Sequence, residues 1–123
     1  MGKIAFVFPG QGAQVVGMGQ NVYENSAVAK DVFEQASKAV DLDLKALCFE
    51  ENNDINITEF TQVCLLTTSV AIMEELKTRG VKADVAAGLS LGEYCALVAA
   101  GSMNFVDAAK ACLLYTSDAA DEL

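Results

Sequence analysis

The 123-residue chain contains no histidine. Imidazole is a frequent zinc ligand and the usual base beside a cysteine nucleophile, so this chain cannot build a histidine zinc site or a Cys-His pair. Basic residues are also scarce, because 8 Lys and Arg stand against 17 Asp and Glu, for a net charge of −9. A nucleic-acid-binding surface needs a basic patch, and these cations are scattered. We therefore expect neither a metal nor a nucleic-acid partner.

Cysteine pairs and long hydrophobic runs are missing too. No cysteine belongs to a C-x-x-C pair and each lies in an apolar stretch, which predicts buried free thiols in a reducing compartment. No run approaches the roughly 20 apolar residues of a membrane span. The run over 4–8 is too short for a signal peptide before Pro9 ends it. We expect a soluble, cytoplasmic protein whose cysteines are Cys48, Cys64, Cys95 and Cys112.

The apolar spacing predicts strands alternating with helices. Continuous apolar runs over 4–8 and 85–88 are typical of strands buried on both faces of a parallel sheet. Helical spacing predicts helices over 25–40, 58–79 and 91–100, a short one within 42–49, and another that Asn104 caps. The fold class is therefore α/β with a parallel sheet. Two strands cannot complete such a sheet, so we expect the first part of a larger domain, with apolar surface exposed where the rest would pack.

The stretch Gly88-Leu89-Ser90-Leu91-Gly92 reads G-x-S-x-G between a predicted strand and a predicted helix. That context is typical of a nucleophile elbow, in which a sharp turn leaves the serine hydroxyl exposed at the end of the strand. The following helix directs its free N–H groups at the same point, where an oxyanion would form. A plain tight turn of small residues is the alternative interpretation.

The stretch Pro9-Gly10-Gln11-Gly12-Ala13-Gln14 is a loop of small residues directly after the first strand. A dinucleotide fingerprint would require glycine at Val15, and a phosphate loop would require Gly-Lys-Ser/Thr, so both are excluded. What remains is a loop whose backbone N–H groups can approach a ligand closely. The Asn-Ile-Thr triple at 56–58 has the pattern of a glycosylation acceptor, which carries no meaning without a secretion signal.

These two motifs, with Thr61-Gln62-Val63 between them, resemble the malonyl-CoA:acyl carrier protein transacylase family from about Lys3 to Ala111. The resemblance implies a partial α/β-hydrolase-like acyltransferase core, without the small ferredoxin-like subdomain and the C-terminal strands. It implies that Ser90 takes malonyl from coenzyme A and passes it to the phosphopantetheine thiol of acyl carrier protein. The backbone N–H groups of Gln11 and Leu91 would form the oxyanion hole. Gln62 matches a glutamine near the substrate pocket, although helix capping or packing would equally explain it.

The resemblance also implies a cytoplasmic enzyme of fatty acid biosynthesis that uses no cofactor, contacts no membrane and is a monomer at full length. Three departures from the family stand out. Leu89 replaces a histidine that is not the catalytic base. The catalytic histidine of the family lies beyond residue 123, and Tyr115 stands where the malonate-binding arginine should be. Residues 112–123 match nothing in the family, so we expect a truncated N-terminal piece with a foreign or disordered tail; a natural acidic terminus is the alternative.

Without a histidine, the serine lacks its base. Glu93 lies three residues from Ser90 but beyond the turn, and no Ser-x-x-Lys motif starts at Ser90. We therefore expect this polypeptide alone to be inactive as a transacylase. The alternatives are an acyltransferase domain of a polyketide or fatty acid synthase, a serine esterase of the α/β-hydrolase type, and a fragment that binds carrier protein without turnover.

Overall fold

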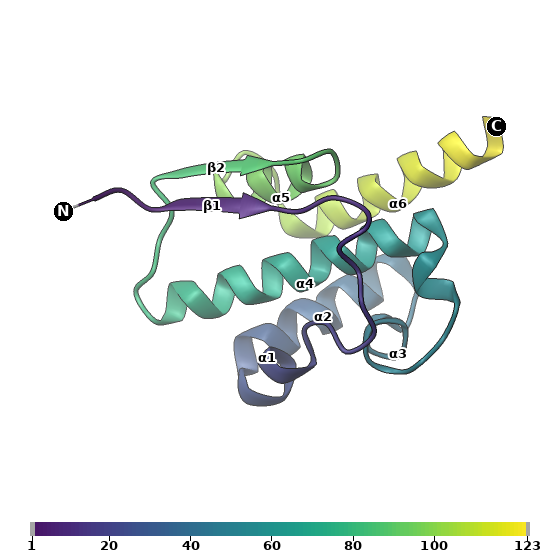
Figure 1. The fold of residues 1–123 in the computed structure, drawn as a ribbon, viewed down its shortest axis with the longest axis horizontal. Coiled ribbons are helices and arrows are strands. Elements are labelled where there is room, and N and C mark those ends of the chain that lie inside the picture. The colour runs from purple at the N-terminus through teal and green to yellow at the C-terminus, as the bar shows by residue number, and fades with distance from the viewer. Residues whose placement is uncertain (1, 123) are drawn as a thin grey trace.

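The structure is a computed structural model that describes the backbone of residues 2–122 and the side chains of residues 2–114. Helices dominate, and two short strands run along one side of them (Figure 1). The elements in chain order are β1 (Ala5–Phe8), α1 (Gln20–Asn25), α2 (Ala27–Val40), α3 (Leu44–Phe49), the 3-10 helix η1 (Asp54–Asn56), α4 (Thr58–Thr78), β2 (Val85–Gly88), α5 (Gly92–Ala99) and α6 (Phe105–Glu122).

The predicted elements are confirmed with small shifts at their ends. The strand over 85–88 has the predicted bounds, and the long helix ends one residue earlier than predicted. The helix expected over 25–40 is α2, which begins at Ala27 because Ser26 is extended and caps it, with its Oγ accepting the Ala29 N–H. Helix α1, over Gln20–Asn25, was not predicted. Asn104 caps α6 as predicted, since its Oδ1 accepts the Val106 N–H at 2.9 Å.

The two strands pair in parallel, with Ala5 opposite Val85 and Phe8 opposite Gly88. All of the helices from α1 to α4 lie between them in the chain, so the pair is a long crossover unit. Because the strands are parallel and in register, both carboxyl ends meet at the same edge of the sheet. The loop after β1 and the G-x-S-x-G turn after β2 therefore come together there.

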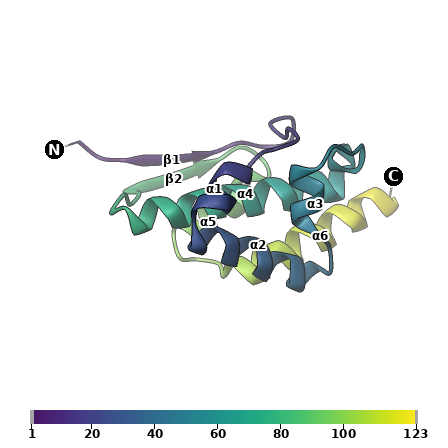
Figure 2. The same ribbon diagram turned by 90° about the horizontal axis from the view of Figure 1, so that it is seen from below.

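Helix α4 lies in the centre of the helical layer, as its apolar pattern predicts. It packs against both α2 and α6, and an unbroken run from Val63 to Thr68 is buried. Seen from below, α2 and α6 lie on the side of α4 away from the strands (Figure 2). All four cysteines are buried free thiols, as expected. No helix in the part of the chain that the structure describes is long and apolar enough to cross a membrane.

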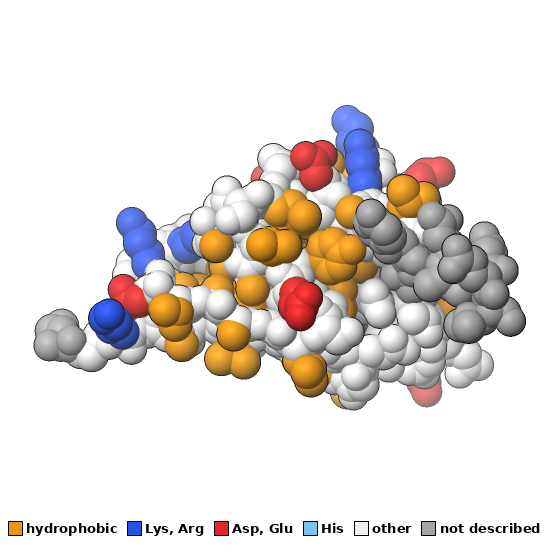
Figure 3. All heavy atoms as spheres, turned by 90° about the horizontal axis from the view of Figure 1, so that it is seen from above, with side chains coloured by type: hydrophobic (Ala, Val, Ile, Leu, Met, Phe, Trp, Pro, Cys, Tyr) orange, Lys and Arg blue, Asp and Glu red, His pale blue; other side chains and the backbone are white. Residues whose placement is uncertain are grey.

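The expectation that the strands are buried on both faces is wrong. Phe6 and Phe8 on one face belong to the hydrophobic core or pack against it, whereas Val7 and Val85 on the other are 76% and 58% exposed. The helices of the described chain cover only one face, so alternate side chains of each strand remain in solvent. The expected exposed apolar surface is thereby confirmed. Viewed from above, hydrophobic side chains also gather across the middle of the surface, in the region of β2 and α5 (Figure 3).

Helix α6 continues without interruption past residue 111, where the family resemblance was expected to end. The proposed boundary between a family segment and a tail over 112–123 stays a prediction. The side chain of Tyr115, expected in the place of the malonate-binding arginine, lies outside the described residues.

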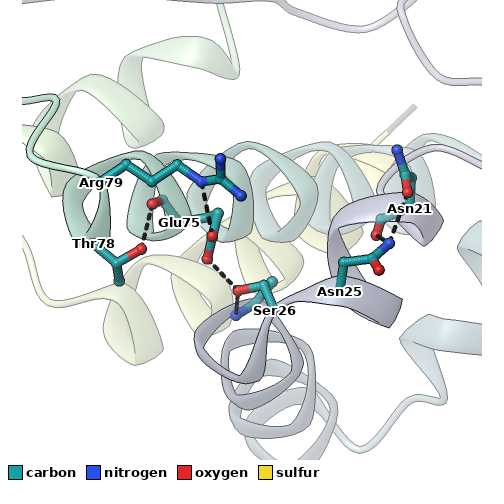
Figure 4. Close-up of polar contacts among 7 residues, drawn as sticks. Asn21, Asn25, Ser26, Glu75, Thr78 and Arg79 are labelled. Atoms are coloured by element: carbon teal, nitrogen blue, oxygen red, sulfur yellow. Dashed lines mark hydrogen bonds and ion pairs between the residues drawn. The ribbon is translucent and has the colours of Figure 1, made fainter.

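Glu75 joins α4 to the start of α2. Its carboxylate accepts a hydrogen bond from the Ser26 hydroxyl at 2.5 Å and another from Arg79 Nε at 3.1 Å (Figure 4). Both contacts favour the charged form, and the Ser26 hydrogen bond is the main reason that the pKa of Glu75 lies below its ordinary value. Since Ser26 also caps α2, this carboxylate links two helices through one hydroxyl.

We expect Glu75→Gln to destabilise the chain at pH 7 and to lose that effect in acid. A depressed pKa in the folded state stabilises the protein above the ordinary carboxyl pKa, and the contribution disappears as the pH falls through the folded-state pKa. The free energy of unfolding, measured by urea titration between pH 7 and pH 3, gives the comparison. Glu74→Gln, which removes only the exposed ion pair with Lys77, is the matched control. A difference between wild type and Glu75→Gln that does not change with pH would contradict the role given to the charge.

Candidate active site

Ser90 lies in the sharp turn that joins β2 to α5, as the nucleophile elbow predicts. Strand β2 ends at Gly88 and α5 begins at Gly92, leaving three residues for the reversal. Ser90 has φ +54°, a left-handed conformation that residues with a side chain rarely adopt. Ser90 is exposed at the carboxyl edge of the sheet. Such a strained position for a serine is typical of a functional turn rather than of a plain one.

Both glycines of the motif are required by close packing. A Cβ atom added to Gly88 would lie 1.9 Å from the carbonyl carbon and oxygen of Gly92. A Cβ on Gly92 would lie 2.3 Å from the carbonyl oxygen of Phe8 in β1. The first turn of α5 therefore packs directly against the ends of both strands. Only glycine leaves room for this approach, which explains the spacing of the motif around the serine.

The loop after β1 lies against the elbow, as the resemblance implies. A Cβ on Gly10 would lie 2.7 Å from the carbonyl oxygen of Leu89 and 3.6 Å from the Cβ of Ser90. Gly10 is buried, so this contact is part of the packed structure. Gln11, the next residue, is thereby brought to the neighbourhood of the serine. The two motifs that are far apart in the sequence form one site.

The backbone N–H groups of Gln11 and Leu91 are the oxyanion-hole donors that the resemblance implies. Within residues 2–122, neither donates a hydrogen bond to a protein atom. Leu91 precedes the first residue of α5, and its buried side chain anchors the turn in the core. Unpaired N–H groups at a helix N-terminus attract negative charge. This arrangement has the donors that an oxyanion beside Ser90 would need.

Gln62 contacts the same loop from α4. Its Nε2 lies 3.5 Å from Oε1 of Gln11, and the Nε2 of Gln11 in turn donates to Oγ1 of Thr58 at 3.1 Å. The structure thus brings together all four residues predicted for the site, Ser90, Gln11, Leu91 and Gln62. Thr58 is a neighbour that sequence reasoning missed. The only signal was its polar side chain at the start of a buried helix.

Two other side chains near the elbow do not provide the missing chemistry. Glu93 is exposed, and its backbone N–H donates a hydrogen bond to the carbonyl oxygen of Ser90 at 2.9 Å. Cys95, one turn into α5, is buried, and burial raises the pKa of its thiol to about 11. The thiol therefore stays protonated at neutral pH and cannot act as a thiolate nucleophile.

Comparison with known proteins agrees with this geometry. The family model described as "Acyl transferase domain" matches residues 5–120. The chain belongs to the acyl transferase family. Among curated proteins it is 48% identical over 109 residues to a malonyl CoA-acyl carrier protein transacylase of Bacillus subtilis (strain 168), covering 88% of this chain and 34% of that protein. It is 43% identical over 111 residues to the protein of that name from Staphylococcus aureus (strain MSSA476), covering 89% of this chain and 35% of that protein.

Solved structures of acyl transferases share the fold. The malonyl CoA-acyl carrier protein transacylase of Clostridium perfringens superposes with a TM-score of 0.91 at 43% identity, over 94% of this chain and 37% of that one. A malonyl-transacylase in complex with a type II PKS acyl-carrier protein superposes with a TM-score of 0.89 at 37% identity, over 94% of this chain and 38% of that one. The chain thus adopts part of the acyltransferase fold and spans about a third of the length of the curated relatives.

Proposed function

We propose that this acyl transferase chain carries the nucleophilic part of a malonyl-CoA:acyl carrier protein S-malonyltransferase. The observation that carries the proposal is the left-handed Ser90 (φ +54°) beside the unpaired N–H groups of Gln11 and Leu91. The reaction is a ping-pong transfer. Ser90 Oγ attacks the malonyl thioester carbonyl, and the oxyanion of the tetrahedral intermediate accepts hydrogen bonds from the two N–H groups. The C–S bond then breaks, coenzyme A leaves as the protonated thiol, and malonyl remains as a serine ester.

In the second half of the reaction, the phosphopantetheine thiol of acyl carrier protein attacks the serine ester through the same oxyanion hole. The serine hydroxyl regains its proton as the new thioester forms. Each half needs a base that takes a proton and returns it, and this chain has no histidine for that role. The base and the cations that bind anionic malonyl-CoA and carrier protein would come from the remainder of a full-length acyltransferase domain. Gln11 and Gln62 would contact the acyl group.

The comparisons support the carrier-protein acyltransferase over the other candidates. The relatives that cover most of this chain at 43–48% identity are malonyl CoA-acyl carrier protein transacylases. One structural neighbour was solved together with an acyl-carrier protein. The loop of Gly10 to Gln14 against the elbow also differs from the His-Gly-Gly-Gly loop that an α/β-hydrolase esterase would more typically carry.

The test is a chimaera in which residues 3–111 of this chain replace the matched segment of the Bacillus subtilis relative. We expect it to transfer malonyl from coenzyme A to carrier protein and to accumulate a malonyl ester on Ser90, located by mass spectrometry of peptides. Ser90→Ala should lower kcat on the order of 10⁶-fold, because it removes the nucleophile, which acts together with its base. Ser102→Ala, in the exposed turn after α5, is the matched control. A folded chimaera that forms no malonyl-serine would refute the proposal, and hydrolysis of simple esters without transfer would indicate an esterase.

A further inference from the structure

The Asn56-Ile57-Thr58 triple contacts the loop after β1, although it has the pattern of a glycosylation acceptor. Asn56 Oδ1 accepts a hydrogen bond from Gln14 Nε2 at 3.1 Å, and Thr58 Oγ1 accepts one from Gln11 Nε2 at 3.1 Å. The two acceptors lie 42 and 47 residues from their donors in the chain. Both polar side chains of the triple thus bind the loop.

Gln14 connects this triple to the backbone of the loop. Its Oε1 accepts the backbone N–H of Gly12 at 2.8 Å, while its Nε2 donates to Asn56. Gly12 has φ +112°, and a Cβ added to it would meet no atom within 4 Å. Packing therefore does not hold this part of the loop. The peptide that joins Gln11 to Gly12 depends on hydrogen bonds for its orientation, and the Gln14 amide supplies one.

The loop consequently has two sets of contacts with the rest of the chain. Gly10 packs against the carbonyl oxygen of Leu89 on the side of the elbow. In addition, the side chains of Gln11 and Gln14 donate hydrogen bonds to the segment in which η1 meets α4. Gln11 follows Gly10 directly in the chain, and its own side chain makes one of the hydrogen bonds to that segment.

We infer that Gln14, Asn56 and Thr58 are positioning residues that hold the backbone N–H of Gln11 beside Ser90. None of them is assigned a contact with substrate. The inference rests on the proposed function, because it concerns the oxyanion hole of that reaction. A donor in this role acts through geometry, and a displacement of about 1 Å can cost about 10²-fold in rate. The triple would then matter for kcat rather than for substrate binding.

The first experiment measures amide hydrogen exchange in the 123-residue chain, by mass spectrometry of a peptide that covers residues 9–16. Gln14→Ala and Asn56→Ala should each speed exchange of the Gly12 amide about three- to tenfold, the value expected for one lost hydrogen bond. Asn56→Asp keeps an acceptor for Gln14 Nε2 and should retain the protection. Gln20→Ala, which removes an exposed amide-to-Glu24 contact on α1, is the matched control. Exchange in Asn56→Ala equal to wild type would overturn the inference.

The second experiment measures the catalytic consequence in the chimaera described above. Asn56→Ala and Thr58→Val should each lower kcat about ten- to a hundredfold with KM unchanged, while Asn56→Asp and Thr58→Ser restore it. A loss in which KM rises and kcat is kept would refute a positioning role, as would no change at all. An inactive wild-type chimaera would instead count against the proposed function, and the exchange experiment in the intact chain would still decide whether the triple holds the loop.

Discussion

Replacing Gly88 with alanine is expected to unfold the chain or to cost about 4 kcal/mol or more of stability, among the largest effects of a single substitution. The new methyl group would lie 1.9 Å from the carbonyl group of Gly92, which is backbone and cannot rotate away. Relief requires α5 to move off the ends of both strands, and Cys95 of α5 is part of the core. Domains of this size are stable by only about 5–15 kcal/mol, so this loss leaves little margin.

Urea unfolding followed by far-ultraviolet circular dichroism measures the effect of Gly88→Ala. Gly80→Ala is the matched control, because its added methyl group meets open space and only its φ of +82° is unfavourable. That variant should lose about 1–2 kcal/mol, the cost of a left-handed conformation with a side chain. Equal stabilities of the two variants would contradict the packing explanation.

The 123-residue chain by itself is expected to transfer malonyl on the order of 10⁶-fold more slowly than the chimaera. A serine hydroxyl is a weak nucleophile until a base takes its proton. Removing the base that acts together with a catalytic serine lowers kcat by about this factor. The sequence has no histidine, Glu93 is exposed, and the Cys95 thiol is held protonated by burial. The elbow and its two N–H groups would retain only the catalysis that an oxyanion site provides.

A steady-state assay with malonyl-CoA and carrier protein, run on the isolated chain and on the chimaera at equal concentration, tests this prediction. Ser90→Ala in the isolated chain is the control for background transfer. Activity of the isolated chain within about tenfold of the chimaera would show that another group in this chain acts as the base. Hydrogen exchange of the two proteins should be similar around Ser90, because the elbow itself is complete in both.

Much of the site was readable from the sequence because its parts are local. The G-x-S-x-G spacing predicts the turn at Ser90, and small residues after β1 predict a loop that can approach a ligand. Strand β2 and helix α4 follow from apolar runs bounded by polar residues and Gly80. These features depend on neighbours within a few positions, where propensity and spacing carry the information.

Other features depend on residues that meet only in the folded chain. The apolar run over 4–8 has the composition of a doubly buried strand, yet Val7 lies on an uncovered face because the described helices pack on one side only. The separation of α1 from α2 follows from Ser26, whose hydroxyl both caps α2 and binds Glu75, a partner 49 residues away.

By itself, the sequence determined the proposed nucleophile, the glycines around it and the lack of any histidine in the chain, since each is a matter of residue identity and short-range spacing. Only the tertiary structure decided that the loop after β1 lies against the turn at Ser90. Parallel pairing of β1 with β2 brings Gly10 against Leu89, and Asn56 and Thr58 accept hydrogen bonds from the same loop. Hydrogen bonds between side chains more than forty positions apart leave no pattern in the sequence, because any exposed amide or hydroxyl could have made them.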